Sequence, residues 1–363
     1  MTTISTTTAA VLQKSNSNLQ VKEVPVAPIN SDEILIESKA ASINGADYYH
    51  IDYNWAPDGA ILGLTVSGIV LKVGKDVTRF GPGDFIASFI HGGDYSNPDK
   101  GAFSKLAVVQ EIYSIKLKNL ESSSLPILPP GNIDTFEGAC SIPNAVVTLG
   151  CSLYFTLGGS FRNPQSKSIL IYGGSTATGL VASQIAKQFG WTVISVASKK
   201  HSNLIKTFGA DHLIDYHDLD VIQQIKNIDP NITMALHTIG GTPTLQLTHD
   251  SVSDSLPTKI DSLVVSNFET IENHKANVEF SMTRAFTANG NEAKYNNGSK
   301  FPATPGIKEA ILEFMPIIQN LINNNEIKHI PIRIQPNGLN GINDGLKLIR
   351  EGSLSGEKLV IQL

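Results

Sequence analysis

A glycine-rich run, Gly173-Gly-Ser-Thr-Ala-Thr-Gly179, follows the apolar segment 168–172 and precedes segment 180–189, which has apolar residues at helical spacing. Glycines between a strand and a helix let the backbone approach a pyrophosphate closely. The helix N-terminus adds free N–H groups and the positive end of its dipole. The middle glycine of such loops is absent here, so an ordinary glycine turn is the alternative. The contacts predicted for a dinucleotide come from Gly174, Ser175, Thr176, Ala177, Thr178 and Gly179.

A second strand is expected at 192–196, and it is followed by a hydroxyl and basic side chains. No Asp or Glu lies between Gly179 and Asp211. An NAD-binding site usually has a carboxylate at the end of this strand, which accepts hydrogen bonds from the ribose hydroxyls. A hydroxyl and ammonium groups instead suit a 2′-phosphate. The pattern favours NADPH over NADH, with solvated lysines in an ordinary loop as the alternative. The residues concerned are Ser198, Lys199, Lys200 and His201.

The same glycine run also resembles a nucleophile elbow, Gly-x-Ser-x-Gly, centred on Ser175. A hydrolase would then need an acid and a histidine downstream, for which Asp215 and His237 are available. Ala177 replaces the second glycine of the elbow, and Gly179 extends the run as a phosphate loop would. The hydrolase interpretation is therefore disfavoured.

The elements that must position these residues change in character near residue 140. Before it, the segments 32–40, 62–73 and 85–90 read as short strands separated by glycine turns, which indicates a compact, partly antiparallel barrel. After it, strands alternate with helices, which indicates an α/β fold with a parallel sheet. The further elements expected are helices at 145–157, 202–208, from 219, and 307–323, strands at 212–215, 233–236 and 261–266, and a tail, 346–363, with a helix, a turn and a strand.

The segment 268–304 is polar, rich in Asn and Gly, and poorly periodic. A structureless loop of this length is usually functional or mobile, so we expect it to form a lid or a wall of the substrate pocket.

Composition narrows the class of protein. The 363 residues carry a net charge of −5, which argues against nucleic acid or an anionic membrane as the main partner and suits two domains. Cys140 and Cys151 are too few for a disulfide framework. No leader sequence and no run of 18 apolar residues is evident, so a cytoplasmic protein that does not span a membrane is expected.

Three motifs together resemble the medium-chain dehydrogenase/reductase superfamily over nearly the whole chain. The stretch from Gly63 to Asp84, with its regularly placed Gly68, Val73, Gly74 and Gly83, is similar to the catalytic-domain signature of that superfamily. The segments 172–179 and 353–360 are similar to its zinc-independent fungal trans-enoyl reductase branch. That branch includes reductases that serve polyketide synthases and yeast reductases of aldehydes and alkenals.

The resemblance implies a GroES-like β-barrel catalytic domain, 1–140 completed by 305–363, and a Rossmann NADPH-binding domain, 141–304, with the active site in the cleft between them. In zinc-dependent relatives a catalytic metal is held by Cys, His and Cys beside a glutamate. The matching positions here are Asn44, Leu64 and Thr148, with Thr65 for the glutamate, and no cysteine precedes residue 140. No metal is therefore expected.

The activity that the resemblance implies is hydride transfer from NADPH to the C=C bond of an enal, enone or enoyl thioester, or to an aldehyde C=O. The catalytic segment would be Asn44-Gly-Ala-Asp47-Tyr48-Tyr49-His50, which resembles the Asn-Pro-x-Asp segment of zinc-free relatives. Tyr49 is the expected donor to the substrate oxygen, because a tyrosine is protonated at neutral pH. Asn44 and Asp47 would orient the segment and the nicotinamide ribose. There are two alternatives. Tyr49 is only a packing aromatic residue, or His50 is the donor instead of Tyr49.

The resemblance implies further cofactor contacts. Tyr216 would flank the 2′-phosphate or the adenine, and the end of strand 261–266 would lie against the nicotinamide, with Leu354 and Ser355 closing over it. From that strand the contacts would be Val264 and Val265. Alternatives to the enoyl reductase are a quinone reductase and an NADPH-binding sensor or partner protein with little turnover. A small-molecule carbonyl or enoyl substrate and a monomer or homodimer are expected.

Overall fold

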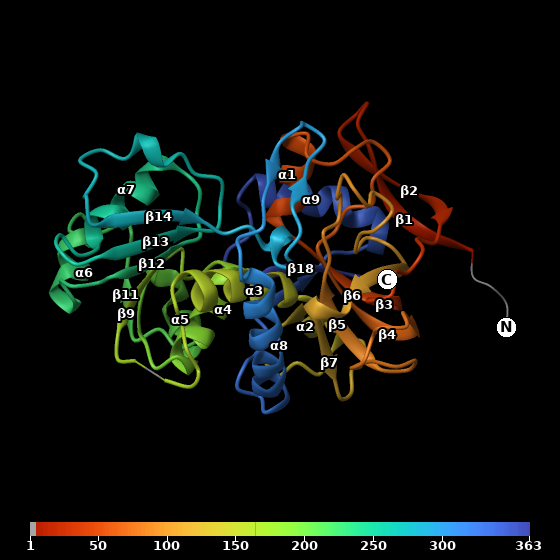
Figure 1. Cartoon of the computed structure of the whole chain (residues 1–363), viewed down its shortest axis with the longest axis horizontal. Helices are drawn as coiled ribbons and strands as arrows, with labels where there is room; N and C mark the ends of the chain where they lie inside the picture. The colour runs from red at the N-terminus through yellow and green to blue at the C-terminus, as the bar shows by residue number, and fades with distance from the viewer. Residues whose placement is uncertain (1–4, 164) are drawn as a thin grey trace. The chain divides into compact units, whose positions relative to one another are not determined.

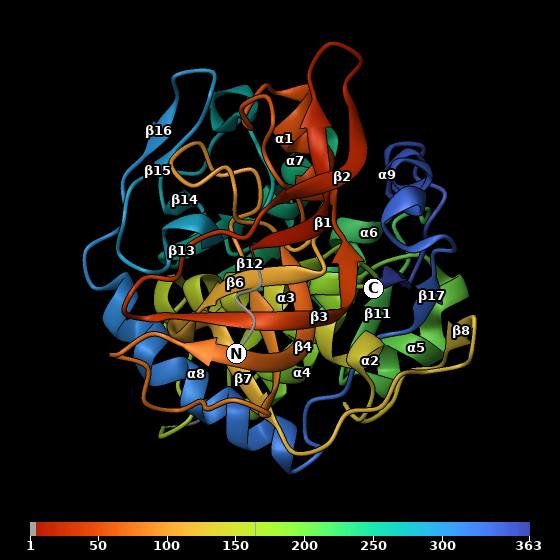
Figure 2. The same cartoon turned by 90° about the vertical axis from the view of Figure 1, so that its right-hand side faces the viewer.

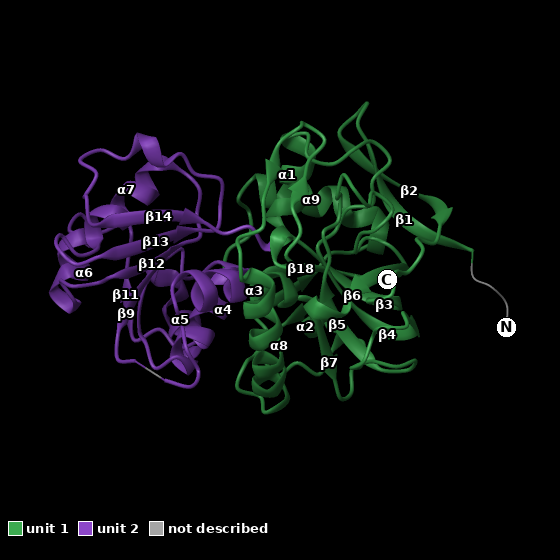
Figure 3. Ribbon diagram, in the orientation of Figure 1, with its two compact units in different colours: residues 1–147, 286–363 green, residues 148–285 purple. Residues whose placement is uncertain are grey.

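The computed structural model describes residues 5–163 and 165–363, which form two compact units (Figure 3). The first unit contains the chain up to Val147 together with Phe286–Leu363, and the second contains Thr148–Ala285. The chain thus leaves the first unit once and returns to it once. Residues 286–304, which the sequence placed in the second domain, group with the first unit.

The first unit is built on a curled sheet with the strand order β7-β5-β4-β3-β18-β17-β8, and β6 pairs with β3 as well (Figures 1 and 2). The strands predicted near 32–40, 62–73 and 85–90 are present as β3, β4 and β5. Antiparallel pairing dominates, and β17 with β18 is parallel. The bounds are β3 Glu33–Ile43, β4 Thr65–Val73, β5 Phe85–Phe89, β6 Leu106–Gln110, β7 Ser114–Leu117, β8 Ile127–Leu128, β17 Ile332–Ile334 and β18 Lys358–Gln362.

Two hairpins accompany this sheet, and both lie in the first unit (Figure 2). One joins β1 (Thr6–Gln13) to β2 (Asn18–Pro25), and the other joins β15 (Ala293–Lys294) to β16 (Lys300–Phe301). The second hairpin lies inside segment 268–304, for which no regular structure was predicted.

Helices cover the first unit. α8 (Ile307–Asn323) has the predicted bounds, and its apolar side chains at Ile311, Phe314 and Ile318 are fully buried, as the helical spacing requires. The tail helix α9 (Ile342–Arg350) begins four residues before its predicted start. α1 (Gly45–Asp52), directly after β3, was not predicted as a helix.

A continuous helical run passes from the first unit into the second. It consists of α2 (Phe136–Cys140), α3 (Pro143–Leu149) and a π-helical stretch, Gly150–Thr156. Among the described residues it is the helix long and apolar enough to cross a membrane by length and composition, yet 83% of its most apolar window is buried inside the protein. Burial of this kind is typical of a core helix.

The second unit is a parallel sheet with the order β11-β10-β9-β12-β13-β14, which confirms the predicted α/β fold. This is the strand order of a doubly wound dinucleotide-binding domain, and the order reverses beside β9. The strands are β9 Ser168–Tyr172, β10 Thr192–Val196, β11 His212–Ile214, β12 Met234–His237, β13 Thr258–Ser262 and β14 Val278–Met282. The helices are α4 Ala177–Gln188, α5 Ser202–Thr207, α6 Val221–Ile228 and α7 Thr242–Ser251.

Two predictions in the second unit were wrong. The strand expected at 261–266 ends at Ser262, so Val264 and Val265 lie in the loop that follows it. The segment from 268 onward is not structureless, because β14 pairs with β13 over five residues. The alternation in β14 was hidden by its polar neighbours, and pairing along a buried strand overrode the weak local pattern.

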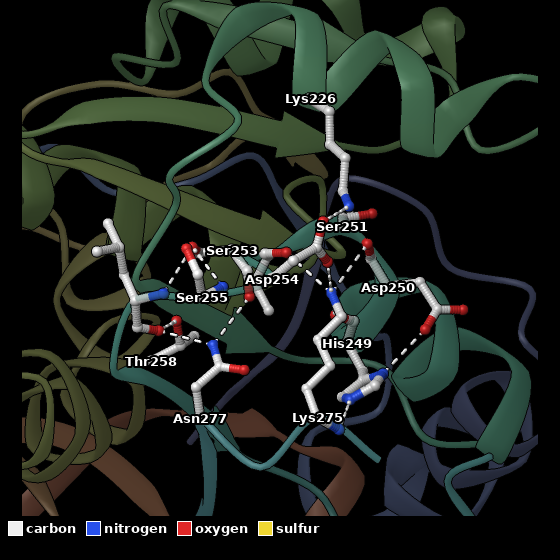
Figure 4. A network of polar contacts seen from close by, with 12 residues as sticks. Lys226, His249, Asp250, Ser251, Ser253, Asp254, Ser255, Thr258, Lys275 and Asn277 are labelled. Carbon is white, nitrogen blue, oxygen red and sulfur yellow. Dashed lines mark hydrogen bonds and ion pairs between the residues drawn. The ribbon is translucent and has the colours of Figure 1, made fainter. Parts of the chain in front are cut away.

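A lysine holds the C-terminus of α7 (Figure 4). Lys275 Nζ donates to the carbonyl oxygens of His249 and Val252, both at 2.9 Å, and of Asp250, at 3.3 Å. It also forms an ion pair with Asp254 at 2.8 Å. The last carbonyls of a helix lack partners inside it, so this cation satisfies them and fixes the loop that leads to β14.

Candidate functional site

The glycine loop of the second unit has the geometry of a phosphate cradle. Thr176 caps α4, and its Oγ1 accepts a hydrogen bond from the Gly179 N–H at 3.0 Å. A Cβ at Gly174 would lie 1.7 Å from Ser195 Oγ, and one at Gly179 would lie 2.4 Å from the Gly173 carbonyl oxygen. A Cβ at Gly179 would collide with backbone atoms, and one at Gly174 would require the Ser195 hydroxyl or the loop to move. The first amides of α4 have no partner within the helix, so they can bind an anion.

The residues after β10 and β11 lie at neighbouring strand ends, since these strands pair in parallel. Lys199 Nζ forms an ion pair with Asp218 at 2.9 Å, whereas the Lys200 side chain is exposed. Tyr216 is 45% exposed. The predicted basic group and the predicted tyrosine therefore occupy the same edge of the sheet.

A carboxylate, Asp215, also lies at this edge, and the sequence had suggested it only as the acid of a hydrolase. Asp215 follows β11 and accepts hydrogen bonds from the backbone N–H groups of His217 and Lys199, each at 3.0 Å. These two hydrogen bonds are the main reason why the pKa of Asp215 is lowered to about 2. The carboxylate thus fixes the loop that carries Lys199.

The side chains of a hydrolase are not brought together. His237 is fully buried, and its ring nitrogens contact Ser262 Oγ at 3.1 Å and Thr244 Oγ1 at 3.0 Å. Asp215 bonds to His217 Nδ1 at 2.6 Å. The acid and the base that a nucleophilic Ser175 would need are engaged with other residues.

In the first unit, polar side chains gather where β3 gives way to α1. Asn44 precedes α1, and its Nδ2 donates to the Ser42 carbonyl at 2.9 Å. Its Oδ1 accepts from Asn144 Nδ2 at 3.3 Å and from Lys358 Nζ. The Asn44 amide is therefore held in one orientation by three neighbours.

Asp47, one turn into α1, is 1% exposed. Its Oδ2 accepts from the Asn44 N–H at 2.7 Å, and its Oδ1 has no hydrogen-bond partner among the described residues. Burial raises the pKa of Asp47 to about 7, although the Asn44 N–H and the charge of Lys358 act in the opposite direction. Burial also lowers the pKa of Lys358 to about 8, and the charge of Asp47 opposes that change.

Tyr49 and His50, the two candidate donors, differ in their surroundings. Tyr49 is partly buried, and its ring centroid lies 4.4 Å from that of Tyr48 and 5.4 Å from that of Tyr53. Burial and Tyr48 raise the pKa of Tyr49, so its hydroxyl keeps its proton. His50 is fully buried, with Nδ1 against the Ala46 carbonyl at 2.7 Å and Nε2 3.4 Å from His91 Nε2. Burial lowers the pKa of His50 to about 4, so the ring is neutral.

The positions that match the zinc ligands of zinc-dependent relatives have side chains that are poor zinc ligands. Leu64 is fully buried hydrocarbon, and Thr65 Oγ1 contacts Ser42 Oγ. Within residues 5–163 and 165–363, no three His, Cys, Asp or Glu side chains are grouped as metal ligands would be. Leu354, predicted to close over the nicotinamide, packs against the hydrophobic core of the first unit, and Ser355 is exposed.

Comparison with known proteins gives the family. The model of the alcohol dehydrogenase GroES-like domain matches residues 30–119. The chain is 36% identical to the uncharacterized protein YCR102C of Saccharomyces cerevisiae, with 94% of this chain and 96% of that protein covered. It is 29% identical to the trans-enoyl reductase ACTTS2 of Alternaria alternata, over 98% of this chain and 99% of that one. The chain belongs to the medium-chain dehydrogenase/reductase superfamily.

Solved structures agree with the superfamily fold. A putative zinc-dependent alcohol dehydrogenase from Rhizobium etli aligns with a TM-score of 0.78 at 21% identity, covering 99% of each chain. The CurK enoyl reductase aligns with a TM-score of 0.72 at 15% identity and the same coverage. The superfamily fold implies a nicotinamide cofactor. The glycine loop before α4, where Gly174 and Gly179 pack closely against Ser195 and the backbone of Gly173, fits the pyrophosphate of such a group.

Proposed function

We propose that this protein is an NADPH-dependent, zinc-free reductase of C=C bonds conjugated to a carbonyl, in an enal, an enone or an enoyl thioester. The observation that carries the proposal is the full-length similarity to a trans-enoyl reductase, 29% identity over 98% of the chain. Reduction of a saturated aldehyde or a quinone is the competing activity within the same superfamily.

The preference for NADPH rests on the residues after β10. Lys200 is exposed, and Ser198 and His201 are partly exposed beside it. An exposed ammonium next to a hydroxyl suits a 2′-phosphate, whereas a ribose hydroxyl would call for a carboxylate acceptor. Asp215, an acid at this edge, is already bonded to two backbone N–H groups, and Asp218 is paired with Lys199.

The chain's own residues have separate tasks in this reaction. When bound, the nicotinamide supplies the hydride. The loop from Gly173 to Thr176 and the first turn of α4 hold the phosphates. Tyr49 keeps its proton and donates to the substrate oxygen, and the fixed amide of Asn44 with Asp47 orients the ribose.

The test is NADPH oxidation, followed by its absorbance, with a 2-alkenal, an enone, crotonyl thioester, a saturated aldehyde and a quinone as acceptors. NADH and an EDTA control run in parallel. Faster turnover of the conjugated acceptors with NADPH, unchanged by EDTA, is expected. Faster turnover of the aldehyde or the quinone would overturn the C=C assignment, and tight NADPH binding without turnover of any acceptor would favour a sensor.

A further inference from the structure

Strand pairing places the side chain of Lys358 at the start of α1. β18 runs antiparallel to β3, with Leu359 opposite Ile43, so Lys358 lies opposite Asn44. On its other side Lys358 is paired in parallel with Ile332 of β17. Both neighbours fix the backbone of Lys358, and its Nζ contacts Asn44 Oδ1.

The ammonium of Lys358 has donors to spare. An ammonium carries three N–H donors, and the described residues supply one hydrogen-bond acceptor to it, Asn44 Oδ1. Asp47 raises the pKa of Lys358 through its charge, but among the described residues the two side chains form neither a hydrogen bond nor an ion pair. A partly buried cation without an ion pair is costly, and such groups are concentrated at functional sites.

The neighbours of Lys358 are arranged so that this ammonium is held. Ser42 and Asn144 fix the Asn44 amide with its oxygen toward the lysine. The second titratable neighbour, Cys140, is fully buried, and burial raises its pKa, so it stays a neutral thiol. Nearby, Asp47 Oδ1 is a buried acceptor without a donor among the described residues, a second sign that a ligand completes this cluster.

We propose that Lys358 is a catalytic residue that binds the carbonyl oxygen of the acceptor and stabilises the negative charge that develops there. This inference rests on the proposed function, and it identifies the cation that stabilises the substrate oxygen in that reaction. With a nicotinamide cofactor bound, its hydride would add to the β-carbon, the electron pair of the C=C bond would form the new C=C bond of the enolate, and the carbonyl π pair would move to oxygen. The Lys358 N–H donors would bind the enolate oxygen. A proton from solvent water would then add to the α-carbon, which gives the saturated product and leaves hydroxide for the buffer to neutralise.

A fixed cation is suited to this task. Without a metal ion the oxygen needs another positive partner, and a preorganised donor aimed at a developing oxyanion contributes about 10²–10³ in rate. The pKa of Lys358 is lowered to about 8, so the side chain is still mainly protonated at neutral pH. Tyr49 then remains available as the second donor.

The experiment compares wild-type enzyme with K358M and K358R, and uses K72M, at an exposed lysine of β4, as the matched control. K358M is expected to lower kcat/KM for the 2-alkenal by about 100-fold, mainly through kcat, with the Kd for NADPH changed by less than about twofold. K358R, which restores a cation, is expected to recover part of the loss. Melting temperatures establish that each variant is folded.

A second measurement does not depend on turnover. Crotonate, a carboxylate with an unsaturated chain, is titrated into the complex with oxidised cofactor, and K358M is expected to bind it at least about tenfold more weakly than wild type. If the wild-type enzyme reduces no acceptor, the proposed function fails, and crotonate binding alone then decides the role of Lys358. Unchanged kinetics and crotonate binding in K358M would overturn the inference. So would a loss confined to NADPH affinity, which would assign the lysine to the cofactor.

Discussion

Asn44 and Asp47 bond to each other in both directions at the start of α1. The Asn44 N–H donates to Asp47 Oδ2 at 2.7 Å, and the Asp47 N–H donates to the Asn44 carbonyl at 3.1 Å. This pair closes the first turn and buries the Asp47 carboxylate within reach of the charge of Lys358. A stable helix start and a perturbed acid therefore arise from the same two residues.

Asp47 and Lys358 should give opposite pH dependences of stability. Burial raises the pKa of Asp47 from 3.8 to about 7, so the folded protein binds the proton more tightly and loses stability as pH rises through that interval. Burial lowers the pKa of Lys358 from 10.5 to about 8, so its folded state gains stability as pH rises between those values. Melting temperature is measured against pH, and D47N should flatten the acidic interval while K358M flattens the alkaline one. Parallel curves for wild type and D47N would contradict the first assignment.

Tyr49→Phe removes the hydroxyl expected to donate to the substrate oxygen and keeps the ring that stacks on Tyr53. We expect kcat to fall by about 10- to 100-fold with little change in melting temperature. Tyr53→Phe is the matched control, because Tyr53 is 48% exposed and lies in the same aromatic group. Steady-state kinetics with the best acceptor measure both variants. Equal activity of the Tyr49→Phe and Tyr53→Phe variants would show that Tyr49 only packs and does not donate to the substrate.

Gly174→Ala tests the phosphate cradle. The new Cβ would lie 1.7 Å from Ser195 Oγ, so either that hydroxyl or the loop must shift. NADPH binding, followed by fluorescence titration, should weaken by about tenfold or more. Gly240→Ala is the control, since a Cβ there meets nothing within 4 Å. The double variant G174A/S195A should recover part of the affinity, and its failure to do so would mean that the clash is not the cause.

Lys200→Gln should reduce the preference for NADPH, because the exposed ammonium is the free charge expected to meet the 2′-phosphate. Lys199→Gln should act less on NADPH and more on the loop, since Lys199 is paired with Asp218 at 2.9 Å. The ratio of kcat/KM for NADPH and NADH measures the effect, and we expect it to fall by about tenfold for Lys200→Gln. A larger fall for Lys199→Gln would reverse the assignment of the two lysines.

Lys275→Met should destabilise the second unit by about 2 kcal/mol, because three carbonyl oxygens at the end of α7 lose a charged donor. Lys226→Met provides the comparison, as Lys226 also pairs with Asp254 at 2.8 Å. Urea unfolding measures both variants, and the second should change stability by less than about 1 kcal/mol. Equal losses would show that the Asp254 ion pair, rather than the carbonyl bonds, matters.

The sequence predicted the elements whose signals are local. The apolar run 168–172, the glycines after it and the periodic segment 180–189 lie side by side in the chain, and the structure has β9, the loop and α4 there. The same holds for α8, where apolar spacing alone defines both ends. The β14 strand escaped prediction because its pairing with β13, rather than its own pattern, makes it a strand.

The residues around Asn44 depended on the tertiary structure. Asn44 could be selected from its resemblance to a family segment, but Lys358 lies 314 positions further along and comes to it through the pairing of β18 with β3. The neutral state of His50 likewise depends on burial, and its Nε2 lies 3.4 Å from Nε2 of His91, 41 positions away. Sequence by itself determined the two kinds of sheet and the glycine loop between β9 and α4, because short-range spacing encodes them. Only the folded chain determined which charges are buried together, because burial and long-range pairing set their pKa values.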